Sequence, residues 1–125
     1  MNKKGFTLIE LLAVIVILAV IALIATPVVM NSINNAREGA AENAGYGVIK
    51  AVEHHIALQV LEDSAYQANE TALNNLTGVN IQGTEPETPM ELQFTNNSVS
   101  GGSMCINGYN LVVDSNGKVE ADGSC

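Results

Sequence analysis

A long apolar run close to the N-terminus is the feature that most limits how this chain folds. Over the 23 residues from Leu8 to Met30, the only departures from apolar, helix-compatible side chains are Glu10, Thr26 and Pro27. As an α-helix this stretch is ~34 Å long at about 1.5 Å per residue, and a hydrocarbon core is ~30 Å thick. The run therefore predicts one helix that can span a bilayer.

The charges that flank the apolar run predict its orientation. Lys3 and Lys4 precede it, and no Lys or Arg follows it until Arg37. Because basic residues stay on the cytoplasmic side, we expect the N-terminus in the cytoplasm and everything after Asn31 exported. The chain has 13 Asp and Glu against 5 Lys and Arg, a formal net charge of -8. This balance argues against direct nucleic-acid binding, which needs clustered cations to neutralise phosphates.

Two ordinary explanations of the run leave Glu10 without a role. One is a secretory signal peptide that is cut after Ala22, where Val20, Ile21 and Ala22 form a small-residue site. The other is a plain membrane anchor. A carboxylate at the bilayer centre costs ~2.5 kcal/mol or more, and less near an interface. Neither a signal peptide nor an anchor gains anything from that carboxylate.

The residues around Glu10 match a known signature. Residues 3–10, with the sequence KKGFTLIE, closely resemble the N-terminus of type IV prepilins and pseudopilins. The resemblance implies that a prepilin peptidase cuts between Gly5 and Phe6 and that Phe6 is then N-methylated. It implies that Glu10 serves assembly, by pairing with the new amine of its own chain or of a neighbour. Pro27 stands where many members of the family have a helix-loosening proline. Because proline lacks an N–H and clashes with the preceding turn, Pro27 predicts a kink or a locally unwound stretch near residues 23–27.

The resemblance also implies a function and a set of partners. The chain would be a structural subunit of a type IV pilus or a pilus-like filament, and it would polymerise with copies of itself and other pilins through its N-terminal helix. It would wait in the bacterial cytoplasmic membrane and then reach the extracellular filament with an assembly platform protein and ATPase. A pseudopilin of a secretion or DNA-uptake system is the alternative. From another class, a membrane-anchored or secreted extracellular binding domain stays open.

The residues after the apolar run predict a second amphipathic stretch. An apolar or small residue recurs at every fourth position, and we expect this face to continue the first helix through residues 31–62. We expect the sheet to pack on the stripe of this face from Ala44 to Val60. Gly39, Gly45 and Gly47 lie within it and predict either interruptions or close contact with that sheet. The recurring positions are Ala36, Ala40, Ala44, Val48, Val52, Ile56 and Val60.

The remainder of the chain predicts a loop and then a small sheet. Residues 63–89 are polar and rich in turn formers, with a short helix over Ala68–Leu76, and the resemblance makes them the αβ-loop. Residues 90–94 alternate between apolar and polar side chains, as a strand with one buried face does, and turns separate the later strands of an antiparallel meander. The expected strands are residues 90–94, 98–106, 109–113 and 118–121, with Asn116-Gly117 in a hairpin turn.

These expectations combine into an α+β fold, in which a long N-terminal assembly helix packs on an antiparallel sheet of three to four strands. The domain order is a leader peptide at residues 1–5, a transmembrane and filament-core helix at residues 6–30, and an exported globular part at residues 31–125.

Few residues suggest chemistry. Adjacent helical residues such as His54 and His55 point about 100° apart, so they predict no metal site, and we expect no cofactor, no catalytic residue and no enzyme. Cys105 and Cys125 are the only cysteines. An exported topology permits a disulfide between them, worth ~3 kcal/mol for a loop of about twenty residues, and a free catalytic thiol is the rival. The resemblance agrees with the disulfide.

Three short segments match the N-glycosylation acceptor pattern. They begin at Asn69, Asn75 and Asn96. Asn is abundant in this part of the chain, so chance matches are expected.

Overall fold

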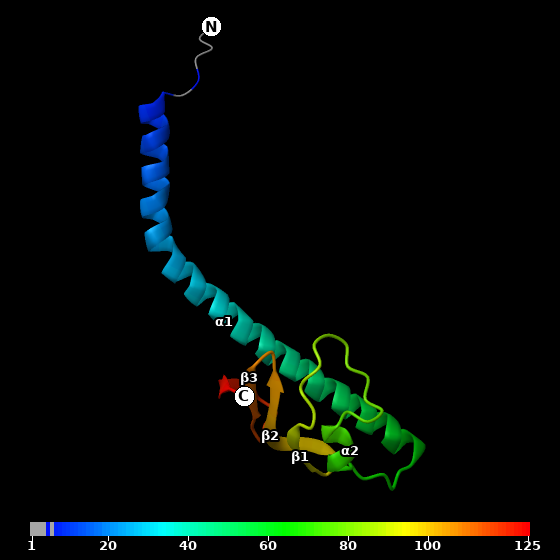
Figure 1. The fold of residues 1–125 in the computed structure, drawn as a ribbon. Coiled ribbons are helices and arrows are strands. Elements are labelled where there is room, and N and C mark those ends of the chain that lie inside the picture. The colour runs from blue at the N-terminus through cyan, green and yellow to red at the C-terminus, as the bar shows by residue number, and fades with distance from the viewer. Residues whose placement is uncertain (1–4, 6) are drawn as a thin grey trace. The chain divides into compact units, whose positions relative to one another are not determined.

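The computed structural model describes residue 5 and residues 7–125. The chain divides into two compact units, Met1–Ala36 and Arg37–Cys125, and we call the second unit the head. Helix α1 (Leu8–Glu62) contributes to both units (Figure 1). We call its apolar part, Leu8–Met30, the stem. Every Leu, Ile, Val and Met of the stem is exposed to solvent within the described chain.

The head is an α+β unit, as the sequence predicts. Its sheet has the order β1-β2-β3-β4 with antiparallel pairing throughout, and a five-residue helix, α2 (Glu70–Asn74), precedes it. Figure 1 shows these elements beside the second part of α1. The strands are β1 (Glu91–Thr95), β2 (Ser98–Ile106), β3 (Tyr109–Val113) and β4 (Val119–Ser124).

The first strand, the last strand and α2 differ in their bounds from the prediction. Strand β1 lies one residue later than expected, and β4 continues to Ser124, which pairs with Tyr109. Helix α2 is shorter than the predicted Ala68–Leu76. The side chain of Asn69 caps its N-terminus by accepting a hydrogen bond from the N–H of Ala72. At the other end Leu76 has φ +56°, a left-handed conformation that cannot continue an α-helix.

The core of the head lies between α1 and one face of the sheet. From α1 the residues Ala41, Gly45, Val48, Ile49, Val52 and Ile56 are buried, and they meet apolar side chains of all four strands. Alternation along the strands explains why one face only is apolar. The largest fully buried side chains are Leu73, Leu92, Ile106, Leu111, Val48 and Val52.

The predicted packing stripe from Ala44 to Val60 lies against the core, whereas Ala36 and Ala40, which begin the same four-residue repeat, are exposed. A four-residue step advances slightly more than one turn of 3.6 residues, so a row at every fourth position winds around the helix. Full burial along α1 begins at Ala41. Ala44 and Val60, nearer the covered region, are partly buried against the core.

Gly45 marks the closest approach of α1 to the sheet. A Cβ atom at this position would lie 2.9 Å from Val119 Cγ1 and 3.0 Å from Leu111 Cδ1. A Cβ atom at Gly39 or Gly47 would meet nothing within 4 Å, so close contact explains Gly45 alone. None of the three glycines interrupts α1.

Side chains outside the sheet occupy hydrogen-bonding groups on both of its edge strands. Along β4, the N–H of Val119 donates to Tyr46 Oη at 3.1 Å and the N–H of Ala121 donates to Glu42 Oε1 at 3.0 Å. Along β1, the side-chain amide of Asn74 bonds both backbone groups of Leu92, accepting from its N–H at 2.9 Å and donating to its carbonyl at 3.1 Å. Asn74 thus pairs with β1 as another strand would.

Candidate functional site

The stem has the dimensions and composition of a membrane-spanning segment. Within the described residues, α1 is the one helix long and apolar enough to cross a bilayer, and its most apolar window has a mean hydropathy of 3.2. None of that window is buried by the rest of the chain. Its apolar side chains therefore need lipid or other protein around them to leave water.

Glu10 lies in the first turn of α1 and forms a reciprocal pair of hydrogen bonds with Thr7. The N–H of Thr7 donates to Glu10 Oε2 at 3.2 Å, and the N–H of Glu10 donates to Thr7 Oγ1 at 3.1 Å. This is a capping box, which satisfies two N–H groups at the start of a helix. The helix dipole also favours a carboxylate at this end.

Sequence analysis did not single out Thr7. The signal was present, since a Thr followed three residues later by Glu is the capping-box pattern. The expected partner of Glu10 was the amine that cleavage would create at Phe6. Phe6 lies outside the described residues, as do Lys3 and Lys4 of the leader. The cleavage between Gly5 and Phe6, the methylation of Phe6 and the assembly role of Glu10 stay predictions.

Pro27 lies inside α1, and the helix is assigned without a break on both sides of it. The locally unwound stretch that we considered near residues 23–27 is therefore absent, and a kink at Pro27 stays a prediction. Proline has no N–H to donate. Beside it, Thr26 Oγ1 donates to the carbonyl of Ala22 at 2.6 Å, a side-chain contact that often accompanies bent helices.

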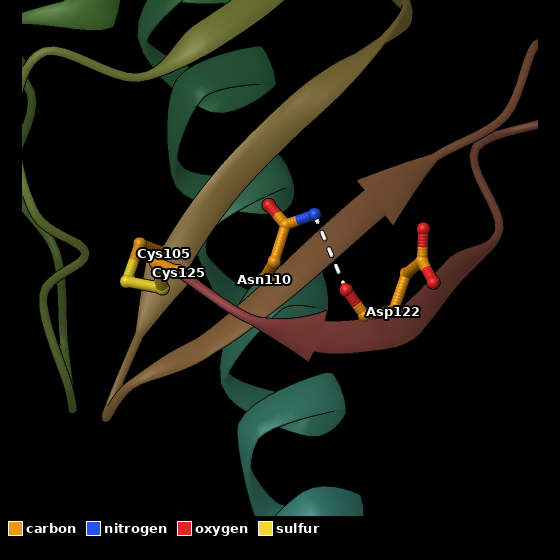
Figure 2. Close-up of a disulfide and its surroundings, with 4 residues drawn as sticks. All are labelled: Cys105, Asn110, Asp122 and Cys125. Carbon is orange, nitrogen blue, oxygen red and sulfur yellow. Dashed lines mark hydrogen bonds between the residues drawn. A yellow bond between two sulfur atoms is a disulfide. The ribbon is translucent and has the colours of Figure 1, made fainter.

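The disulfide between Cys105 and Cys125 is confirmed, and the free-thiol alternative is wrong. It joins β2 to the residue that follows β4, with 6.0 Å between the two Cα atoms. The N–H of Cys125 also donates to the carbonyl of Gly108 at 3.1 Å. Figure 2 shows the disulfide beside the hydrogen bond from Asn110 Nδ2 to the carbonyl of Asp122, at 3.4 Å. These contacts hold the last strand onto β3 and β2.

The charged groups of the head form few close pairs. Lys118 Nζ lies 2.8 Å from Glu120 Oε1, and both side chains are largely exposed. The hydrogen bond to Glu120 raises the pKa of Lys118 above its usual value, but solvent screens such exposed pairs. Among the described residues no three His, Cys, Asp or Glu side chains gather as a metal site would require.

The comparison with protein families bears on the N-terminal region. The family model described as the prokaryotic N-terminal methylation motif matches residues 1–26. This match covers the N-terminal segment whose residues resemble those of type IV prepilins and pseudopilins. The long apolar helix and the four-stranded antiparallel sheet form a pilin-like architecture. No curated protein and no solved structure matches the chain.

Proposed function

We propose that the chain is a non-catalytic structural subunit of a type IV pilus or pilus-like filament. A prepilin peptidase cuts it between Gly5 and Phe6, and the subunits polymerise through their N-terminal helices. The observation that carries the proposal is a fully exposed apolar stem with one carboxylate, Glu10, in its first turn. The head buries its own core and exposes only scattered large apolar side chains such as Leu58 and Leu61, so the continuous apolar surface that needs partners is the stem.

Cleavage would change the charge at the start of the stem. It would remove Lys3 and Lys4, which leaves three basic residues, Arg37, Lys50 and Lys118, and all 13 acidic ones. It would also create a cationic amine at Phe6, one helical turn before Glu10, where residues four apart are neighbours.

The pairing of Glu10 would select one arrangement of neighbouring stems. Among packed apolar helices an unpaired carboxylate is strongly unfavourable, whereas a paired one is tolerated. One axial offset between neighbours would place an amine at each carboxylate. The capping box with Thr7 supports this role, because it keeps the carboxylate at the end of the helix where the new amine forms.

Each stage of this life cycle has its own partners. Before assembly the subunit spans the cytoplasmic membrane with its N-terminus in the cytoplasm. Afterwards the head lies on the extracellular surface of the filament. An assembly platform and its ATPase would drive the transfer. The same chemistry would serve a pseudopilin of a secretion or DNA-uptake system, in which the filament stays short.

The proposal is tested in cells that express the chain with a prepilin peptidase and an assembly system. Mass spectrometry of the mature N-terminus is expected to find N-methylated Phe6. Glu10→Ala is expected to reduce sheared filaments at least tenfold with little change in processing. The matched control is Glu38→Ala, which removes an exposed acid of α1 beyond the stem and should leave filament yield unchanged.

The other classes of protein predict different termini. An intact Met1 on a subunit that never polymerises would indicate a membrane-anchored binding protein. A mature chain that begins at Leu23 would indicate a secreted one. Either result, or normal filament yield from Glu10→Ala, would overturn the proposal.

A further inference from the structure

A cavity of about 480 Å³ lies in the head, between the loop that follows α1, the start of α2 and the turn from β1 to β2. Small-molecule sites typically occupy roughly 300–1,000 Å³. The residues that matter for its chemistry are Tyr66, Gln67, Glu70, Phe94, Asn96 and Asn97. They lie far from the stem in the sequence, and the proposed assembly mechanism uses none of them.

Asn97 holds the walls of this cavity together. Its Oδ1 accepts a hydrogen bond from the N–H of Ala68 at 2.8 Å, and its Nδ2 donates to the carbonyl of Tyr66 at 3.0 Å. Asn97 has φ +63°, a conformation for which Gly is usually preferred. An Asn here supplies the two hydrogen bonds that Gly lacks. The loop and the turn are therefore fixed to each other before any ligand arrives, which lowers the entropic cost of binding.

The lining combines aromatic surface with unused hydrogen-bonding groups. Tyr66 and Phe94 are half-buried, so their rings are partly available. Gln67, Glu70 and Asn96 are exposed. Among the described residues, the side chains of these three form no hydrogen bond with the rest of the chain. They offer two amides and one carboxylate, with both donors and acceptors.

The charge of the site selects among ligands. None of the lining side chains is cationic, and Glu70 contributes a carboxylate. Anionic ligands such as phosphates or acidic sugars would be repelled. A purely apolar ligand would leave the amides and the carboxylate without partners, which is unfavourable. A neutral ligand with several hydroxyl groups and an apolar C–H face satisfies both parts of the lining.

We infer that this cavity binds one sugar unit of a neutral glycan. Tyr66 and Phe94 provide the apolar surface, and Glu70, Gln67 and Asn96 bond the hydroxyl groups. The inference goes beyond the proposed function and does not depend on it. A single subunit contains every lining residue, so the site would exist without a filament. Failure of filament assembly would leave it unaffected.

The test is saturation-transfer NMR on the full chain in micelles of dodecylphosphocholine, a detergent without a sugar headgroup. The probes are glucose, galactose and N-acetylglucosamine, with sialic acid as the anionic comparison. At least one neutral sugar is expected to show transfer with an affinity of about millimolar, which corresponds to a few hydrogen bonds and a small apolar contact. Transfer to no neutral sugar, or stronger transfer to sialic acid, would overturn the inference.

The decisive variant is Asn96→Gly. Asn96 has φ +53°, so Gly keeps the turn and removes only the amide. Binding should weaken roughly three- to tenfold, the loss expected for one or two hydrogen bonds. Adding Glu70→Ala should abolish detectable transfer.

A matched control lies in the next hairpin turn. Asn107 has φ +52°, is exposed, and does not line this cavity. Asn107→Gly should therefore leave the affinity unchanged. Equal weakening in both single variants would contradict the site. So would a covalent glycan on Asn96 of the native chain, because the acceptor pattern begins at that residue.

Discussion

Glu42 on α1 accepts a hydrogen bond at 3.0 Å from the backbone N–H of Ala121 on β4, across 79 residues of sequence. One turn later on the same helix face, Tyr46 accepts from the N–H of Val119. Strand β4 lies at the edge of the sheet, so no further strand pairs with these two N–H groups. The side chains of Glu42 and Tyr46 accept their hydrogen bonds instead. Helix α1 therefore contributes polar contacts as well as apolar ones to the head.

Glu42→Ala should lower the free energy of unfolding of the head by about 1–2 kcal/mol, because the N–H of Ala121 loses its acceptor. Glu42→Gln keeps an acceptor oxygen and should have less than half this effect. Urea unfolding of the full chain in micelles, followed by tyrosine fluorescence, measures the head selectively, since all three tyrosines lie there. Equal losses from Glu42→Ala and the control Glu38→Ala would show that the hydrogen bond contributes nothing.

Gly45→Ala should destabilise the head by about 1–3 kcal/mol, the usual range for overpacking a core. The added Cβ would force Val119 and Leu111 to move. This loss exceeds the gain of about 1 kcal/mol in helix propensity. At Gly47 an added Cβ would meet nothing within 4 Å beyond its own stretch of helix. The same substitution there should be neutral or stabilising by up to about 1 kcal/mol. Thermal unfolding of the two variants should therefore shift in opposite directions.

Asn74→Ala should cost about 2–3 kcal/mol, because it leaves both backbone groups of Leu92 without their partner. Amide hydrogen exchange at Leu92 should accelerate at the same time. Asn75→Ala removes a hydrogen bond that stays within the end of α2, and it should leave exchange at Leu92 unchanged. Unchanged exchange in Asn74→Ala would show that the side chain of Asn74 does not protect the N–H of Leu92.

The paired substitution Cys105→Ser and Cys125→Ser should lower stability by ~3 kcal/mol, the value of the chain-entropy model for a separation near twenty residues. The residues of β4 should then become the first to exchange and the first to be removed by carboxypeptidase. Replacing both cysteines avoids a free thiol. If β4 stayed as protected as in the parent chain, the hydrogen bonds of Asn110 and Cys125 alone would be sufficient to hold it.

The elements of the head followed from local patterns in the sequence. In β1 and β3 buried positions alternate with more exposed ones, and the buried face of α1 has helical spacing, so periodicity indicates these elements. It could not show how far the sheet extends along α1. For that reason the four-residue repeat includes Ala36 and Ala40, which are exposed, as well as the stripe from Ala44 to Val60 that packs on the core.

The contacts that sequence analysis missed are polar and mostly long-range. Asn74 meets Leu92, 18 residues away, and Tyr46 meets Val119, 73 residues away. Neither pair has a periodic or local signal, because a single side chain bonds a backbone group that could belong to any residue. The contact between Thr7 and Glu10 is the exception, since its spacing is a recognised local pattern. The processing residues Gly5 and Phe6 rest on the methylation motif.

Side chains that bond the two edge strands of the sheet limit how closely packed heads can aggregate. A filament or a membrane reservoir would hold many copies of one head at high local density, a condition under which bare strands join and aggregate. Asn74 blocks part of one outer strand, and Glu42 with Tyr46 blocks part of the other. Edge-to-edge pairing of two sheets would first have to displace these side chains, so the proposed association through the apolar helix would meet less competition from strand pairing.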